Sequence, residues 1–174
     1  WIMIASVVSL FSGSQFKNDE AFFSPEVKND PNFAEGYYFL GNYYLKDGQY
    51  EKAAQNFEAA IRDQSGFLVH KDKESININL AASYLELNKL DEAQSLYEKI
   101  YPSVSENLKQ YILFNRALIA QRRGDYDLVI KILEGRDWNI PEAYLLLAQA
   151  YNQQKNTKKE IETLKKALHL LPPN

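Results

Sequence analysis

The sequence predicts an all-α solenoid of about four helical hairpins, and three observations support this fold class. No stretch alternates apolar and polar residues for long enough to indicate a strand. Residues that favour helices are abundant, and the 174-residue chain has only seven glycines and six prolines. One pattern of apolar and small residues also recurs along the chain, which is typical of repeat architectures. The apolar content of 45% is sufficient for one short array.

The clearest copy of the pattern lies at residues 34–64. Its first half predicts one helix, with Tyr37, Leu40 and Tyr44 on a single face. Gly48 interrupts this helix, and apolar residues at a spacing of three to four then predict a second helix. The copy therefore reads as a helix–turn–helix hairpin.

Three further copies follow at irregular intervals. The residues expected in the turns, Gly48, Asn88, Gly124 and Lys155, are 40, 36 and 31 residues apart. These intervals are close to a period of about 34 residues. We expect hairpins at approximately 34–67, 74–106, 110–138 and 141–174, together forming an array at 34–174, and a half-repeat or connecting helix at 17–33.

Small residues mark the expected helix crossings. Each first helix carries one of them, and the full set is Gly41, Ala81, Ala117 and Ala148, faced by Ala53 and Ala93 of the second helices. A large side chain at such a crossing would force the two helices apart, at a cost of roughly 1–3 kcal/mol.

This pattern resembles the tetratricopeptide repeat, over almost all of residues 34–174. The resemblance implies a right-handed superhelix whose first helices line a concave groove for an extended peptide or a partner helix. The departures are Arg116, Arg136 and Glu160, where the family has small or apolar residues. They affect the helix boundaries of the third and fourth hairpins, and not the fold class.

Irregular spacing locates the connections between the hairpins. Six extra residues around 65–71 predict a longer helix or a loop, and the second helix of the third hairpin is expected to stop near Gly135. Pro141 is expected to open the next helix. The chain reaches Asn174 without the polar capping helix that such arrays carry, so more chain or a second copy is expected to cover the last hairpin.

Projecting the repeat register predicts the residues that line the groove. They are Tyr38, Asn42, Leu45, Asn79, Tyr111, Asn115, Arg122, Gln149 and Asn152. Amide side chains can donate to and accept from a peptide backbone, and tyrosine adds contact area with one polar end. The alternative for each apolar member is that it packs between helices. Because the set carries few charges, apolar contacts and hydrogen bonds are expected to dominate binding.

One specialisation of the family can be tested by residue. Members that grip a C-terminal carboxylate use two asparagines and three basic residues, and Asn42 and Asn79 match the asparagines. The basic positions fall on Tyr38, Tyr111 and Asn115, none of which is cationic. Without charge-assisted hydrogen bonds, carboxylate capture is not expected.

Composition and motifs argue against other classes of function. A net charge of −3 disfavours nucleic acid as a partner, and the absence of cysteine excludes thiol chemistry and cysteine-bound metals. The two histidines, His70 and His169, have no second ligand at metal spacing. No phosphate loop or nucleophile motif is present. We therefore expect no enzyme, no cofactor and no metal, and a protein or peptide as partner.

Residues 1–16 contain no charged residue. The apolar part, 1–11, would rise only about 16 Å as a helix, against a bilayer core of roughly 30 Å. Three alternatives stay open: the end of a transmembrane helix, part of a signal peptide, or a helix packed on the first repeat.

The order of segments is similar to the junction in O-mannosyltransferase-like membrane proteins that carry C-terminal tetratricopeptide repeats. That resemblance implies a non-catalytic accessory module, attached to a membrane and outside the cytoplasm. A cytoplasmic scaffold and a structural self-association module are the alternatives.

Overall fold

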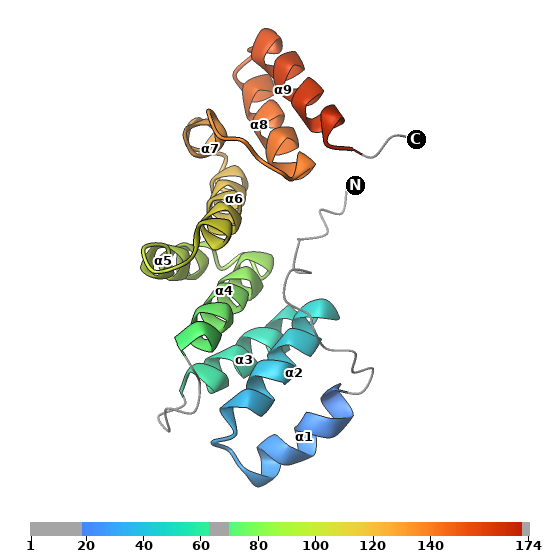
Figure 1. Cartoon of the computed structure of the whole chain (residues 1–174), viewed down its shortest axis with the longest axis vertical. Helices are drawn as coiled ribbons and strands as arrows, with labels where there is room; N and C mark the ends of the chain where they lie inside the picture. The colour runs from blue at the N-terminus through green and yellow to red at the C-terminus, as the bar shows by residue number, and fades with distance from the viewer. Residues whose placement is uncertain (1–18, 63–69, 172–174) are drawn as a thin grey trace. The chain divides into compact units, whose positions relative to one another are not determined.

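The computed structural model describes residues 19–62 and 70–171, and all regular structure in them is helical (Figure 1). The helices are α1 (Asp19–Asn29), α2 (Ala34–Lys46), α3 (Tyr50–Ile61), α4 (His70–Glu86), α5 (Leu90–Ile100), α6 (Glu106–Arg122), α7 (Tyr126–Leu133), α8 (Pro141–Gln153) and α9 (Thr157–His169). The chain divides into two compact units, Trp1–Pro102 and Ser103–Asn174. The all-α solenoid class is thus confirmed.

The first unit contains the hairpins α2–α3 and α4–α5, with α1 packed against α2 and α4 against α3. Its core joins Leu40 and Phe57 of the first hairpin to Ile76 and Leu80 of α4. A helical hairpin cannot cover its own apolar face, so the next first helix completes the core.

Helix α1 takes the place of a second helix before the first hairpin. Phe23 and Val27 pack against the core, and the Phe23 ring stacks on Phe39 with centroids 4.8 Å apart. Both side chains of α1 therefore face the first hairpin. Pro25 lies inside α1, which the structure describes from Asp19 to Asn29.

The predicted crossing at Gly41 is present and is close. A Cβ atom built on Gly41 would lie 2.6 Å from Cε1 of Phe57, a ring that is fully buried. The equivalent Ala81, Ala117 and Ala148 are also almost fully buried. Small residues therefore set the distance between the two helices of a hairpin.

The four predicted turn residues all have a left-handed backbone. Their φ angles are 75° at Gly48, 58° at Asn88, 76° at Gly124 and 58° at Lys155. At each turn the residue after the turn residue donates its N–H to the carbonyl five positions earlier, as from Gln49 to Tyr44 at 2.9 Å. This Schellman pattern satisfies carbonyls at the helix end and starts the next helix two residues later.

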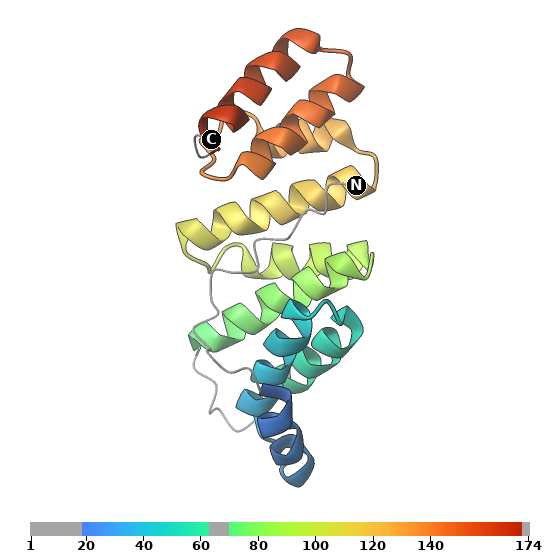
Figure 2. The ribbon, with the colours of Figure 1, turned by 90° about the vertical axis from the view of Figure 1, so that its right-hand side faces the viewer.

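The second unit contains the hairpins α6–α7 and α8–α9, and Figure 2 shows α8 and α9 side by side. Helix α7 has only eight residues and ends at Leu133, slightly before the expected stop near Gly135. The buried Trp138 closes the connection, because its Nε1 donates to the Leu133 carbonyl at 3.0 Å. Pro141 opens α8, as predicted.

Candidate peptide-binding face

The first unit brings three of the predicted groove residues together on its first helices, α2 and α4. Asn79 Nδ2 donates to Asn42 Oδ1 at 2.8 Å, and this bond links the two first helices directly. Both amides are partly buried. We call Asn42 and Asn79 the amide pair. One hydrogen bond between two amides leaves each with further donors and acceptors.

Tyr38 lies one helical turn before Asn42 on α2. Its ring packs at 6.4 Å from the ring centroid of Phe57 and at 5.7 Å from that of Phe39. The side chain is half-buried, so part of the aromatic ring is at the surface. A partly exposed aromatic beside amides can offer both contact area and hydrogen bonds to a peptide.

Two predicted groove residues are buried. Leu45 is 4% exposed and belongs to the core of the first unit. Asn115 is also 4% exposed, and its Nδ2 donates to the carbonyl of Tyr111 on its own helix at 2.9 Å. For Leu45, packing between helices was the alternative already open, and the structure favours it.

The second unit repeats the amide contact with other residues. Gln121 Nε2 of α6 donates to Gln149 Oε1 of α8 at 2.6 Å. Gln149, Arg122 and Asn152 are exposed. Sequence reasoning missed Gln121, although it lies three residues before its turn residue, as Asn152 does, and the register alone would have found it.

Asn152 lies at the end of α8, and its Nδ2 donates to Glu160 Oε1 of α9 at 3.0 Å. Tyr111, near the start of α6, is half-buried. Gln149, Asn152 and Arg122 thus give the first helices of this unit an exposed polar surface.

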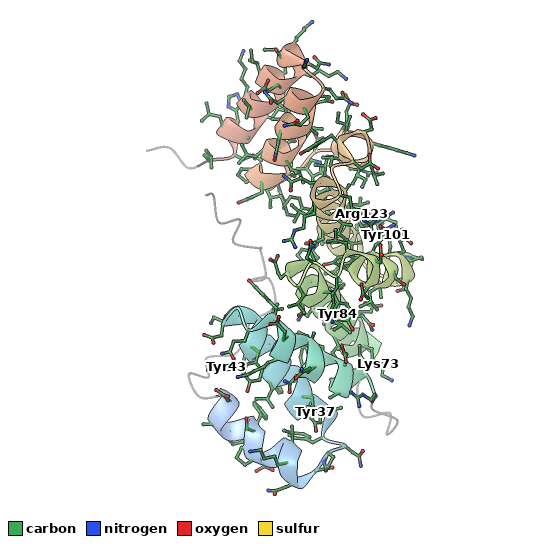
Figure 3. All side chains as sticks on the ribbon, turned by 180° about the vertical axis from the view of Figure 1, so that it is seen from behind. Tyr37, Tyr43, Lys73, Tyr84, Tyr101 and Arg123 are labelled. Atoms are coloured by element: carbon green, nitrogen blue, oxygen red, sulfur yellow. The ribbon has the colours of Figure 1, made fainter. Side chains whose placement is uncertain are left out.

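A second recurring contact joins three of the four hairpins to the segment of chain before them. The phenol groups of Tyr44, Tyr84 and Tyr151 donate to Glu20, Glu58 and Glu134 at 2.8, 2.8 and 2.5 Å (Tyr84 is labelled in Figure 3). Burial, together with the neighbouring carboxylate, raises the pKa of each of these tyrosines to about 12. A lysine Nζ also lies over each ring, at 4.9 Å for Lys52, 5.4 Å for Lys89 and 5.1 Å for Lys159.

These Tyr–Glu contacts are structural. With a pKa near 12 the phenols stay protonated at neutral pH and act as fixed donors. Glu134 is held in its ionised form, because the hydrogen bonds from Lys159 and Tyr151 lower its pKa. Neither the three phenols nor the Glu134 carboxylate is therefore set to exchange a proton near pH 7.

A cavity of about 130 Å³ lies in the second unit, where the short α7 leaves room beside α8 and α9. Glu134 and Lys159 line it and form an ion pair at 2.7 Å. Within residues 19–62 and 70–171, no three metal-ligating side chains lie close enough together to hold an ion. None of the helices that the structure describes is both long and apolar enough to cross a bilayer. The apolar residues 1–16 lie outside the described residues, as does most of the predicted connection at 65–71.

These features define a helical-repeat protein in which, within each unit, an amide–amide hydrogen bond joins the two first helices. The chain belongs to the tetratricopeptide repeat family. One family model, described as tetratricopeptide repeat, matches residues 30–107 and another matches residues 141–172, together more than half of the chain. A search of curated proteins found no match.

Solved structures of similar fold agree with the family. A crystal structure of MamA is 16% identical, with a TM-score of 0.69, and the match covers 85% of this chain and 84% of that one. MamA from MSR-1 is 21% identical, with a TM-score of 0.63 and coverage of 88% and 90%. YrrB, described as a TPR protein with an unusual peptide-binding site, is 20% identical, with a TM-score of 0.64 and coverage of 88% and 77%. At these identities the likeness shows the fold.

Proposed function

We propose that the chain is a protein-interaction scaffold that binds an extended peptide segment across the first helices of its first unit. The observation that carries the proposal is the amide pair, because Asn42 and Asn79 are joined across α2 and α4 at 2.8 Å. Amides fixed in this way present donors and acceptors to a peptide backbone without first losing side-chain freedom. YrrB, which has a similar fold, is described as having a peptide-binding site.

The expected ligand is an uncharged or weakly charged stretch of peptide. The half-buried Tyr38 ring provides apolar contact next to the amide pair, and no cation lies at the positions that would grip a terminal carboxylate. Hydrogen bonds to the backbone would set the register, and one apolar side chain would rest on Tyr38.

To test this proposal, a displayed peptide library is screened for peptides that bind the whole chain. The affinity of a selected peptide is then measured for Asn42→Ala plus Asn79→Ala. We expect a loss of about tenfold, because each lost hydrogen bond contributes about 0.5–1.5 kcal/mol.

Asn56→Ala is the matched control. Asn56 is also a half-buried asparagine, but it lies on the second helix α3, where its amide donates to the Lys52 carbonyl at 2.8 Å. Equal affinities for the wild type, the control and the double variant would show that the peptide binds elsewhere.

Membrane attachment is a separate proposal and rests on the uncharged segment 1–16. The order of segments in the chain resembles the junction in O-mannosyltransferase-like membrane proteins. In such a protein the array would be an accessory module. The test is co-sedimentation of the chain with phosphatidylcholine vesicles, compared with Ile4→Asp plus Leu10→Asp. Charge in an apolar anchor is costly, so this variant should stay in the supernatant. Equal sedimentation of both proteins would contradict attachment through this segment.

A further inference from the structure

The last helix, α9, presents a row of exposed apolar side chains. Ile161, Leu164 and Leu168 are 49%, 41% and 67% exposed, and Leu171, just beyond the helix end, is 52% exposed. Their spacing of three, four and three residues puts them on one side of the helix. We call these four residues the α9 stripe. The side that faces the hairpin is different and carries the buried Thr163 and Ala167.

The position of Leu164 is covered in earlier hairpins, whereas Ile61, at the register position of Leu168, is 38% exposed. Leu164 lies nine residues after its turn residue, as Phe57 and Leu133 do, and both of these are fully buried. Phe57 shares its core with Ile76 and Leu80 of α4, the first helix of the next hairpin, and α8 packs in the same way on α7. Leu164 therefore lies where earlier hairpins contact the next first helix, and the α9 stripe extends from it along the exposed side of α9.

The charges beside the stripe indicate what kind of helix fits. At 100° per residue, Lys158 and Lys165 border the stripe on the side turned away from α8, and both are exposed. The other lysines of α9 are engaged elsewhere: Lys159 pairs with Glu134 at 2.7 Å, and Lys166 lies 5.8 Å from the Tyr144 ring centroid. The open edge is thus basic, in a chain whose net charge is −3.

We propose that the α9 stripe docks an amphipathic helix of a partner protein, with apolar residues at three-to-four spacing and acidic residues beside them. The apolar side chains of the partner helix would lie where a following first helix packs in earlier hairpins. Its acidic side chains would face Lys158 and Lys165. Two copies of α9 packed antiparallel would instead bring these lysines against each other, which disfavours that self-association. This surface belongs to a second helix and is separate from the amide pair.

The test uses a synthetic helical peptide of about 16 residues, roughly four turns, with Leu at the stripe spacing and Glu at the flanking positions. A second peptide has Lys in place of every Glu. Binding of both to the whole chain is measured by fluorescence anisotropy at low salt. We expect the acidic peptide to bind at least about tenfold more tightly than the basic one.

Two variants locate the binding. Leu164→Ser plus Leu168→Ser should weaken the acidic peptide at least about tenfold, because the apolar contact is lost. Lys158→Glu plus Lys165→Glu keeps the apolar contact and should reverse the preference in favour of the basic peptide. All four positions are exposed, so both proteins should keep the wild-type circular dichroism spectrum.

Asn42→Ala plus Asn79→Ala separates this surface from the proposed peptide-binding face. It should bind the acidic peptide like the wild type. A loss of binding in that variant, equal binding of the two peptides, or a dimer in sedimentation that depends on Leu164 and Leu168 would each overturn the proposal.

Discussion

At the scale of single residues, the turns show how strongly backbone geometry selects side chains. The four turns inside the hairpins each have a left-handed residue, which is glycine in two of them and Asn88 or Lys155 in the others. For a residue with a Cβ atom, this conformation costs roughly 1–2 kcal/mol of folding free energy. For glycine the main cost is the larger conformational entropy that the unfolded chain loses on folding. The packing of the flanking helices holds this turn conformation even where the turn residue is Lys155.

Lys155→Gly is therefore expected to stabilise the protein, by about 0.5–1 kcal/mol. The reverse change, Gly124→Ala, should destabilise it by about 1 kcal/mol through the backbone alone, because a Cβ atom at Gly124 would meet nothing within 4 Å. Urea denaturation measures both. If Lys155→Gly destabilised the protein, the left-handed backbone at position 155 would not carry the free-energy cost that we infer.

Gly41 provides a second residue-scale prediction. Gly41→Ala should destabilise the protein by about 1–2 kcal/mol, since the new methyl group would overlap the buried Phe57 ring. Combining it with Phe57→Leu should cost less than the sum of the two single changes. Strict additivity in this double-mutant cycle would mean that the two residues do not limit the approach of the helices.

At the scale of elements, the Tyr–Glu contacts link each of three first helices to the helix before it. The pKa of each tyrosine is about 12 in the folded protein, above the ordinary value of 10.0, so the folded state keeps these protons longer. This contribution to stability is complete below pH 10 and is lost as the pH rises toward 12. Replacing Tyr84 with Phe should reduce the loss of stability over that range, measured by thermal melts at successive pH values. An unchanged alkaline profile would contradict the role of its phenol.

Glu134 has the opposite dependence on pH. Its pKa is lowered, chiefly by the hydrogen bond from Lys159, so its contribution is present above pH 4.5 and is lost as the pH falls through the folded value. Glu134→Gln should flatten the acid limb of the stability profile, and it should also weaken the alkaline loss, because the Glu134 carboxylate helps to raise the pKa of Tyr151. Glu162→Gln, at an exposed position of α9, is the control and should change neither limb.

The sequence predicted the elements well, because local chemistry determines them. Gly48 and Gly124 break helices and Pro141 starts one, whatever the surrounding fold. The crossing at Gly41 also follows from local pattern, since a small residue recurs at that register. The engagement of Tyr44 with Glu20 could not be read from the sequence, because it depends on how two helices pack, 24 residues apart in the chain.

The candidate site was less predictable than the fold. The register correctly assigns side chains to first helices, but it does not decide which are covered. Leu45 and Asn115 are buried, whereas Gln149 is exposed at the register position of Asn42. Burial depends on the size of the neighbouring side chains, and the repeat pattern fixes only some of those.

At the scale of the whole molecule, the helices that the structure describes contact only their nearest or next-nearest neighbours in the chain. Stability in such an array is roughly a sum of hairpin and neighbour terms. Gly41→Ala should therefore speed amide hydrogen exchange in α2 and α3 most, and in α8 and α9 least. Uniform acceleration throughout the chain would indicate a single cooperative unit instead.

The amide pair gives the most direct test of the proposed scaffold role. Side-chain NH₂ groups of asparagine give separate signals in ¹⁵N–¹H spectra, so Asn42, Asn79 and the control Asn56 can be followed while a selected peptide is added to the labelled chain. We predict that the Asn42 and Asn79 signals shift in proportion to occupancy while that of Asn56 stays in place. Saturating peptide that leaves both signals unmoved would contradict binding across α2 and α4.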